Sequence, residues 1–171
     1  MKLKDSKVNA EYTTVHYHFE GGIEFEWNWS TGSKCWYLNG ELHCENGPAI
    51  EEPDGPKRWF LNGKRHREDG PAIEYADGSK WWYLNGKRHC EDGPAIEWFN
   101  GSKAWYLNGE LHREDGPAAE WPNGSKHWYL NGEPHRKDGP AIEDADGSKE
   151  WFLSGKRLSA QEFKNEIKRH H

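Results

Sequence analysis

The chain has 171 residues, a net charge of −6 and a mean hydropathy of −1.17, which is low for a protein with a thick apolar core. Its 11 tryptophans and 14% aromatic content argue against disorder, because disordered chains are poor in large rings. Charges of both signs are mixed along the chain, so no clustered basic face is available for nucleic acid. The acidic balance also disfavours binding to anionic membrane surfaces.

The N-terminal part of the chain predicts a loose segment followed by a β-hairpin. Residues 1–10 are polar, and we expect a loose segment there without a secretory leader. Residues 11–30 alternate between apolar and polar side chains around Gly21-Gly22, which is typical of two strands joined by a tight turn. Two sets of side chains should each share a face: Thr13, Val15, Tyr17 and Phe19, and then Ile23, Phe25, Trp27 and Trp29. We interpret residues 11–35 as a hairpin cap, because an uncapped array exposes an open strand edge.

From residue 36 onward the chain repeats itself every 23 residues. The clearest marker is a tryptophan that recurs at this spacing, at Trp36, Trp59, Trp82, Trp105, Trp128 and Trp151. A fixed period of this kind defines an array in which each repeat packs mainly against its neighbours. We therefore assign residues 36–155 to 23-residue repeats and interpret the recurring tryptophans as a structural ladder.

Each repeat carries two turn signals. One is Asn-Gly after Leu, as in Asn85-Gly86, and the other is Asp-Gly or Asn-Gly, as in Asp77-Gly78. Such pairs between alternating segments are typical of two-residue hairpin turns, in which both central residues take positive φ. We therefore predict two-residue turns at both places in every repeat.

A two-residue turn at Asp77-Gly78 fixes the register of the flanking strands. Ile73 is then predicted to lie opposite Trp82. One face would hold Ile73, Tyr75, Lys80, Trp82 and Leu84, and the other Ala72, Glu74, Ala76, Trp81 and Tyr83. We predict that the Trp/Leu/Ile face is the buried one. The same register gives the cross-strand pairs Glu52–Lys57, Trp98–Lys103, Trp121–Lys126 and Asp144–Lys149.

Two chain reversals in each repeat relate successive repeats by translation. This parity predicts an all-β fold, an elongated antiparallel sheet of stacked β-hairpins. The His-x-Glu-Asp-Gly-Pro segment that follows the Asn-Gly turn would be a loop within the returning limb. A three-sided β-solenoid with parallel ladders is the alternative, and the hairpin-type turns favour the antiparallel sheet.

The C-terminal residues 156–171 change character and are expected to form a second cap. The signals are a capping box at Ser159 and Glu162 and an apolar pair at Phe163 and Ile167. They predict a short amphipathic helix over residues 159–169 that covers the last hairpin. The terminal His170-His171 pair fits either a native end or the start of a tag.

The repeats follow a recognisable pattern, written YLNGKRHCEDGPA at residues 83–95. Over residues 31–155 the chain resembles the MORN repeat and its variant in bacterial, tailed-phage and giant-virus proteins. It lacks the usual Tyr-Glu-Gly-Glu-Trp strand and carries His-Arg-Glu-Asp-Gly-Pro-Ala in place of a shorter glycine link. The resemblance implies a non-catalytic scaffold or partner-binding protein, and for some bacterial variants an antitoxin role.

Recurring histidines and acidic pairs raise the question of a metal site. The histidines are His43, His66, His89, His112 and His135. Successive histidines lie about 10 Å apart along such a sheet, so one zinc ion cannot bridge two repeats, and we interpret them as structural. The acidic pairs are Glu68-Asp69, Glu91-Asp92 and Glu114-Asp115. They supply too few oxygens for calcium, and turn chemistry explains them equally well. We predict no metal and no cofactor.

Catalysis has no support in the sequence. Repeated His and Glu side chains do not single out one place in the array. An active site would require a nucleophile or an acid–base pair set apart from its repeat equivalents. We therefore predict that the protein is not an enzyme.

Five large rings occupy positions that hold Glu, Asp, Arg, Ala, His or Pro in other repeats. They are Tyr75, Trp81, Trp98, Phe99 and Trp121. Protein interfaces are enriched in aromatic anchors, so we interpret these residues as candidate partner-binding residues. The alternative is that the rings fill local gaps in a thin sheet.

The leading functional hypothesis is a protein–protein interaction module, of the viral or bacterial inhibitor or antitoxin type, that binds and occludes a partner. One alternative is a small-ligand or carbohydrate binder with repeated aromatic slots. Another is a homodimer or larger scaffold that buries its apolar face between copies. Three scattered cysteines, Cys35, Cys44 and Cys90, suit a reducing compartment, and no apolar stretch is long enough to span a membrane, so we expect a cytoplasmic protein.

Overall fold

The structure is a computed structural model, and it describes residues 2–9, 14–28 and 30–169. It divides into two compact units, unit 1 (Met1–Lys87) and unit 2 (Arg88–His171). Both units are built almost entirely of short strands, and the described part of the chain contains one helix, at the C-terminal end of unit 2. The terminal His170-His171 pair lies outside the described residues.

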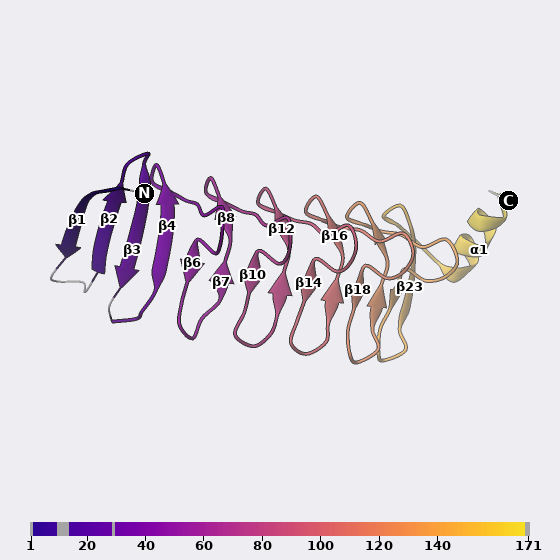
Figure 1. The fold of residues 1–171 in the computed structure, drawn as a ribbon. Helices are drawn as coiled ribbons and strands as arrows, with labels where there is room; N and C mark the ends of the chain where they lie inside the picture. Colours follow the sequence, from indigo (N-terminus) through magenta and orange to yellow (C-terminus); the bar gives the residue numbers. More distant parts are fainter. Residues whose placement is uncertain (1, 10–13, 29, 170–171) are drawn as a thin grey trace. The chain divides into compact units, whose positions relative to one another are not determined.

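Unit 1 begins with four long strands, drawn in indigo and purple in Figure 1. They are β1 (Leu3–Asn9), β2 (Thr14–Phe19), β3 (Ile23–Asn28) and β4 (Lys34–Leu38). Neighbours pair antiparallel in chain order, and β2 turns into β3 at Gly21 and Gly22, which both have positive φ, as predicted. The expectation of a loose segment at residues 1–10 is wrong, because residues 3–9 form β1 and pair with β2.

Stacked rings connect this hairpin to the first repeat. Tyr17 lies opposite Phe25, with ring centroids 5.8 Å apart, and the Phe25 ring lies 4.4 Å from that of Trp36. Such contacts stabilise a sheet beyond simple burial. Thr13 and Trp29, which the sequence placed on the same faces, lie outside the described residues.

The later repeats share one plan of two-residue strands. In unit 1 these are β5 (Glu41–Leu42), β6 (Ile50–Glu51), β7 (Lys57–Arg58), β8 (Phe60–Leu61), β9 (Lys64–Arg65), β10 (Ile73–Glu74), β11 (Lys80–Trp81) and β12 (Tyr83–Leu84). The main sheet of this unit runs β1-β2-β3-β4-β6-β7-β10-β11. β8 and β9 form a small separate hairpin, and β5 pairs with β4.

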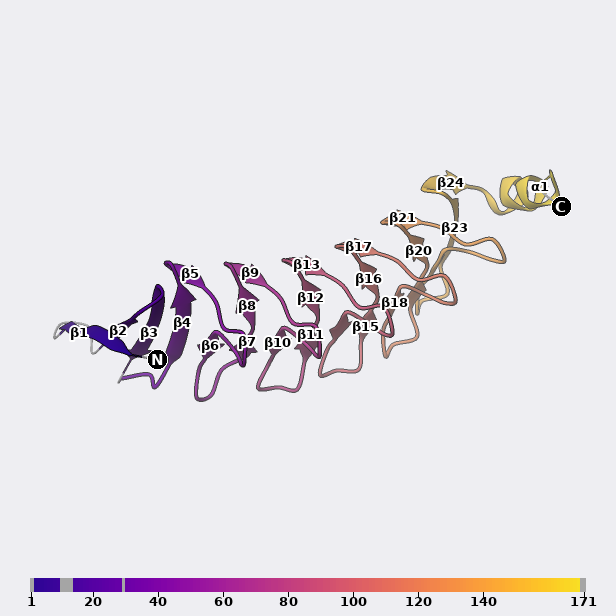
Figure 2. The same cartoon turned by 45° about the horizontal axis from the view of Figure 1, so that its top comes forward.

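Unit 2 continues the same plan after β13 (Lys87–Arg88), which spans the division between the units. Its strands are β14 (Ile96–Glu97), β15 (Lys103–Ala104), β16 (Tyr106–Leu107), β17 (Glu110–Leu111), β18 (Ala119–Glu120), β19 (Lys126–His127), β20 (Tyr129–Leu130), β21 (Glu133–Pro134), β22 (Ile142–Glu143), β23 (Lys149–Leu153) and β24 (Lys156–Leu158). The order β14-β15-β18-β19-β22-β23-β24 forms the sheet, while β16–β17 and β20–β21 are separate hairpins, labelled in Figure 2.

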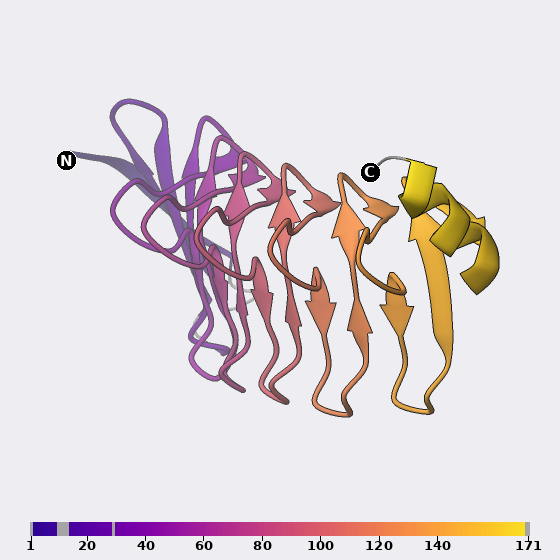
Figure 3. The same ribbon diagram turned by 90° about the vertical axis from the view of Figure 1, so that its right-hand side faces the viewer.

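Every described strand pair is antiparallel, and the sheet is made of sequential hairpins without closing into a barrel. The all-β hairpin prediction is therefore confirmed. The parallel ladders of a three-sided solenoid do not occur among the described pairs. The His-x-Glu-Asp-Gly-Pro segment is a loop within the returning limb, as predicted, and in unit 2 it leaves the strands on one side (Figure 3).

The two turns of each repeat differ in type. At the Leu-Asn-Gly turns the asparagines have φ between 48° and 53° and the glycines are also positive, as a two-residue turn requires. At the other turn Gly78 has φ of 91°, but Asp77 has no positive φ. Tyr75 instead pairs with Ser79, whose carbonyl accepts the Tyr75 N–H, so the loop has three residues and ends in a left-handed glycine. The two-residue prediction is wrong at this turn.

The longer loop shifts the strand register by one residue. Ile73 lies opposite Trp81 and not Trp82, and Glu74 lies opposite Lys80. A one-residue shift moves every side chain of one strand to the other face. The predicted face that joined Ile73 with Lys80, Trp82 and Leu84 is therefore wrong.

The lysine pairs change with the register. Each recurring lysine lies opposite glutamate, in the pairs Lys80–Glu74, Lys103–Glu97, Lys126–Glu120 and Lys149–Glu143. The predicted pairs Glu52–Lys57, Trp98–Lys103, Trp121–Lys126 and Asp144–Lys149 are wrong for the same reason, and in the first of these hairpins Ile50 lies opposite Arg58. The lysines thus share a face with these glutamates, and strand alternation places Tyr75, Trp81, Trp98 and Trp121 on the opposite face.

The core is thin and is built around the Gly-Pro-Ala alanines. Ala49, Ala72, Ala95, Ala118 and Ala141 are completely buried. The carbonyl of Ala72 accepts the N–H of the preceding ladder tryptophan, Trp59, at 2.8 Å, and the same bond recurs from Trp36, Trp105 and Trp128. In unit 1, Trp59, Tyr75 and Trp81 cover a cluster of Ala72, Ile73 and Tyr83.

The helix α1 (Ala160–Arg169) follows β24 and contacts β23 and β24. The predicted capping box is confirmed, because Ser159 N–H donates to Glu162 Oε2 at 2.7 Å and Glu162 N–H donates to Ser159 Oγ at 3.3 Å. Phe163 is buried. Within the described part of the chain, no helix is long and apolar enough to cross a membrane.

Candidate functional site

Two of the predicted partner-binding residues pack inside unit 1. The rings of Tyr75 and Trp81 meet edge to face with centroids 5.2 Å apart, and both lie against the buried cluster around Ile73. Neither belongs to the exposed large apolar residues. These two rings therefore fill the sheet locally, which is the alternative that the sequence left open.

The other three lie in unit 2, where Phe99 and Trp121 are exposed and Trp98 is half-buried, as Tyr75 and Trp81 are. Phe99 lies in a turn loop and is 71% exposed, and Trp121 is 38% exposed. The Trp121 ring meets the His127 ring at 4.6 Å. Trp98 and Trp121 stand two residues after Ile96 and Ala119, whose strands flank β15, so both rings share a face. We call Trp98, Phe99 and Trp121 the aromatic surface.

Hydrogen bonds hold the loops that carry the aromatic surface. Asn100 Oδ1 accepts the Ser102 N–H at 2.9 Å, and Asn123 Oδ1 accepts the Ser125 N–H at 3.0 Å. The two loops are neighbours, because a Cβ placed on Gly101 would meet Pro122 at 3.6 Å. The exposed rings therefore stand on a preorganised edge of the sheet.

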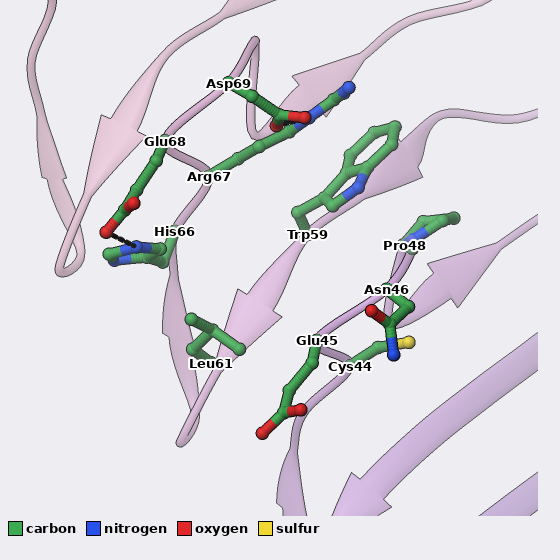
Figure 4. A pocket seen from close by; sticks show the side chains of 11 residues that line it. Cys44, Glu45, Asn46, Pro48, Trp59, Leu61, His66, Arg67, Glu68 and Asp69 are labelled. Carbon is green, nitrogen blue, oxygen red and sulfur yellow. Dashed lines mark hydrogen bonds and ion pairs between the residues drawn. The ribbon is translucent and has the colours of Figure 1, made fainter.

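A feature that sequence reasoning missed is an arginine held over the ladder tryptophan. The Arg67 guanidinium lies 4.2 Å from the Trp59 ring centroid, and Figure 4 places its side chain above that ring. Arg67 Nε donates to Asp69 at 2.9 Å, and Nη1 donates to the Pro71 carbonyl at 3.2 Å and to Glu74 at 2.9 Å. The signal available in the sequence was an arginine that follows the recurring histidine.

The same arrangement recurs twice in unit 2. Arg113 lies 4.1 Å from the Trp105 ring and Arg136 lies 3.8 Å from the Trp128 ring. The acceptors are Asp115, the Pro117 carbonyl and Glu120 for Arg113, and Asp138, the Pro140 carbonyl and Glu143 for Arg136. The hydrogen bond from its arginine lowers the pKa of each aspartate in these three loops, Asp69, Asp115 and Asp138. The acidic tips of these loops therefore hold a guanidinium of their own chain.

The recurring histidines join successive repeats. In four of the five, the backbone N–H of an asparagine in the next Asn-Gly turn donates to the histidine Nδ1, for example from Asn85 to His66 at 3.2 Å. The same bond joins Asn62 to His43, Asn108 to His89 and Asn131 to His112. In the described residues no group of three or more His, Cys, Asp or Glu side chains is arranged to hold a metal ion.

Cavities lie between the loops of successive repeats. In unit 1 a cavity of about 760 Å³ separates the loop at residues 44–48 from Trp59 and residues 66–69 (Figure 4). Unit 2 has an equivalent cavity of about 530 Å³ between residues 113–116 and residues 135–138, with Trp128 in its wall. Both cavities are lined by an aromatic ring, arginine and acidic side chains. Each unit therefore contains a cavity between successive loops of the kind that the small-ligand alternative requires.

Comparisons with known proteins add no relative: no family model matches the chain, and no curated protein matches it. The relation to the MORN repeat therefore stays a prediction that rests on the residues of the repeat alone.

Proposed function

We propose that the protein is a non-enzymatic module that binds and occludes a protein partner through the aromatic surface. The observation that supports this best is the 71% exposure of Phe99 in a turn where the equivalent repeat positions hold Ala76, Pro122 and Ala145. Among the described residues, Leu3 and Trp121 are the other exposed large apolar side chains. Burying such a ring in an interface stabilises a complex by about 1.5–3 kcal/mol.

The position of these rings also favours a binding role. Two neighbouring loops carry them, and hydrogen bonds to Asn100 and Asn123 hold those loops before any partner arrives. A preformed surface loses little conformational entropy on association, so more of the contact energy appears as affinity. Aromatic anchors of this kind are the residues that dominate interface energetics.

We further propose that the partner is an enzyme or toxin that the protein inhibits, as in viral or bacterial inhibitors and antitoxins, and that the protein works in the cytoplasm. The inhibitor role draws on the resemblance to MORN-like arrays. The compartment draws on three cysteines that are all free thiols.

Site-specific crosslinking tests the proposed surface. A photoreactive phenylalanine analogue replaces Phe99 in one sample and Leu3, an exposed apolar residue of unit 1, in a matched control. After irradiation in an extract of the producing cells, we expect one discrete adduct from position 99 and none of that mass from position 3. Equal adducts from both positions, or none from position 99, would contradict the proposal.

The equivalent cavities in the two units favour a second candidate, a small-ligand or carbohydrate binder. Titration calorimetry separates the two functions, because repeated slots take several ligands per chain whereas a protein partner binds once. A third possibility is a homo-oligomeric scaffold. Light scattering tests it, and a monomer at micromolar concentration would exclude it.

A further inference from the structure

The repeats differ at the residue that follows the recurring histidine. Three repeats carry arginine there, namely Arg67, Arg113 and Arg136, and two carry cysteine, namely Cys44 and Cys90. The three arginines have equivalent contacts, so their loops define what a guanidinium site looks like in this array. The cysteine loops can be compared with it group by group.

The reference site in unit 2 is the one around Arg113. Its Nε donates to Asp115 at 2.8 Å, and its Nη1 donates to the Pro117 carbonyl at 3.3 Å and to Glu120 at 3.2 Å. Two carboxylates and a carbonyl thus converge on one guanidinium. Charge-assisted bonds of this geometry are the strong ones in proteins.

The Cys90 loop keeps the acceptors and lacks the cation. Asp92, Pro94 and Glu97 stand where Asp115, Pro117 and Glu120 stand in the Arg113 loop. Burial raises the pKa of the Cys90 thiol, hydrogen bonds from the backbone N–H groups of Asp92 and Gly93 lower it, and the charges of the Asp92 and Glu97 carboxylates raise it. In the described part of the chain, neither carboxylate has an ion-pair partner, whereas Asp115 and Glu120 both pair with Arg113. A Cβ placed on Gly116 would meet the Arg113 guanidinium at 3.0 Å, whereas one placed on Gly93 would meet no atom within 4 Å, so the space beside Gly93 is open.

In the Cys44 loop the arginine is replaced by cysteine, and the acidic groups around it change as well. Asn46 stands in place of the aspartate, which removes one carboxylate, and Lys34 Nζ lies 3.7 Å from Glu51, which stands in place of the glutamate. A cavity of about 380 Å³ opens beside Trp36, with Cys44 and Asn46 in its wall. In this loop the negative charge is reduced, and the remaining glutamate is paired. In the Cys90 loop both carboxylates remain, and Glu97 lies opposite Lys103 in the sheet.

We propose that the Cys90 loop is a vacant guanidinium site that receives an arginine side chain of a protein partner. Asp92 and Glu97 supply the charge and the Pro94 carbonyl supplies the third acceptor, as their equivalents do for Arg113 and Arg136. The proposal rests on the proposed function for the source of the arginine, and the site itself is testable without any partner.

The test is an NMR titration of the full chain with N-acetyl-arginine amide, followed at the amide signals of Asp92 and Gly93. We expect saturable shifts at millimolar ligand, and at least about tenfold weaker binding of the uncharged citrulline analogue. Cys90→Arg supplies the missing group from the chain itself, as three other repeats do, and should abolish the shifts. Glu97→Gln should weaken binding while keeping the shape of the side chain.

A gain-of-site variant guards against misfolding as an explanation. Arg113→Cys should create a second saturable site, followed at the amides of Asp115 and Gly116. No shift at Asp92 in the wild type, or equal shifts in Cys90→Arg, would overturn the proposal. If N-acetyl-arginine amide fails to bind while the crosslinked adduct from position 99 still forms, the guanidinium site is contradicted and the proposed function is not. If the amide binds and no adduct forms, the proposed function is contradicted and the guanidinium site is not.

Discussion

We expect the arginine that lies over a ladder tryptophan to contribute more to stability than an exposed charge pair, because a ring contact adds to its hydrogen bonds. Arg113 is the best case in unit 2, since it contacts the Trp105 ring and donates to three acceptors. Its side chain is only 23% exposed, so its interactions are less screened than those at the surface. Its partner Asp115 is well exposed, which limits the gain from that pair.

Arg113→Ala is therefore expected to lower the free energy of unfolding by about 1–2 kcal/mol, through the lost ring contact and the hydrogen bonds to Glu120 and Pro117. Urea denaturation measures the effect. Lys126→Ala is the matched control, because Lys126 is exposed on the sheet, and it should cost less than about 0.5 kcal/mol. Equal losses for the two variants would contradict this role of the arginine.

His135 differs from the other recurring histidines in what faces its ring. Ser154 N–H donates to its Nδ1 at 3.0 Å, while its buried Nε2 has no hydrogen-bond partner. Burial lowers the pKa of His135, the Lys137 charge lowers it further, and Glu133 opposes the shift. A lowered folded-state pKa means that the unfolded chain binds the proton more readily. The stabilisation from His135 is therefore present above about pH 6.5 and is lost as pH falls through its folded pKa.

Lys137→Glu should raise the pKa of His135, because it removes a positive charge and supplies the glutamate that the other four repeats carry two residues after the histidine. An NMR titration of the His135 ring measures the shift. Lys126→Glu, an equal change of charge in strand β19, should leave the pKa of His135 nearly unchanged. An unchanged pKa in Lys137→Glu would refute this electrostatic explanation.

At the scale of the single residue, the sequence located the exposed rings but could not separate them from the packed ones. Tyr75 and Phe99 look equally anomalous in the repeat, yet Tyr75 packs on Trp81 whereas Phe99 is exposed. Their exposure differs because Tyr75 lies in the paired part of the hairpin whereas Phe99 lies inside the turn loop, and the strand register determines these positions. The guanidinium site was missed because none of its residues is unusual in the sequence, and only the fold brings the arginine, the tryptophan and the acceptors together.

At the scale of the element, the two turns show why a single dipeptide did not determine a register. Asn-Gly after Leu forms the predicted two-residue turn, whereas Asp77-Gly78 ends a three-residue loop. Asp77 Oδ1 accepts the Ser79 N–H at 2.8 Å, which favours the longer loop and keeps Asp77 out of the left-handed region. Strand pairing is compatible with either a two-residue or a three-residue turn here, so we attribute the longer loop to this local hydrogen bond. The capping box of α1 was predictable because both of its partners are local in sequence.

Two glycines of unit 2 allow a test of whether the three-residue loop requires a glycine with positive φ at its last position. A Cβ added to Gly124 or to Gly93 would meet no atom within 4 Å, but only Gly124 has a positive φ, of 95°. Gly124→Ala should therefore destabilise the protein by about 1–2 kcal/mol through backbone strain. Gly93→Ala should be neutral or stabilising by up to about 1 kcal/mol. Thermal unfolding compares the two, and similar effects would show that the left-handed glycine is not required.

At the scale of the whole molecule, the repeat determines the fold and the departures from it carry the proposed function. The period, the hairpin architecture and the C-terminal cap were predictable, because they depend on local patterns that recur or on contacts between neighbours. The face assignments were not, because a one-residue error in one turn inverts them in every repeat. The proposed binding groups, the aromatic surface and the Cys90 loop, both lie where some repeats differ from the others.

The central claim is that the protein binds a partner through the exposed rings of unit 2. The most direct test measures the affinity of the crosslinked partner, once purified, for the wild type, Phe99→Ala and Leu3→Ala by titration calorimetry. We predict one partner per chain, at least about tenfold weaker binding for Phe99→Ala, and a change within about twofold for Leu3→Ala. Equal affinity of all three proteins, or an equal loss in both variants, would contradict the account.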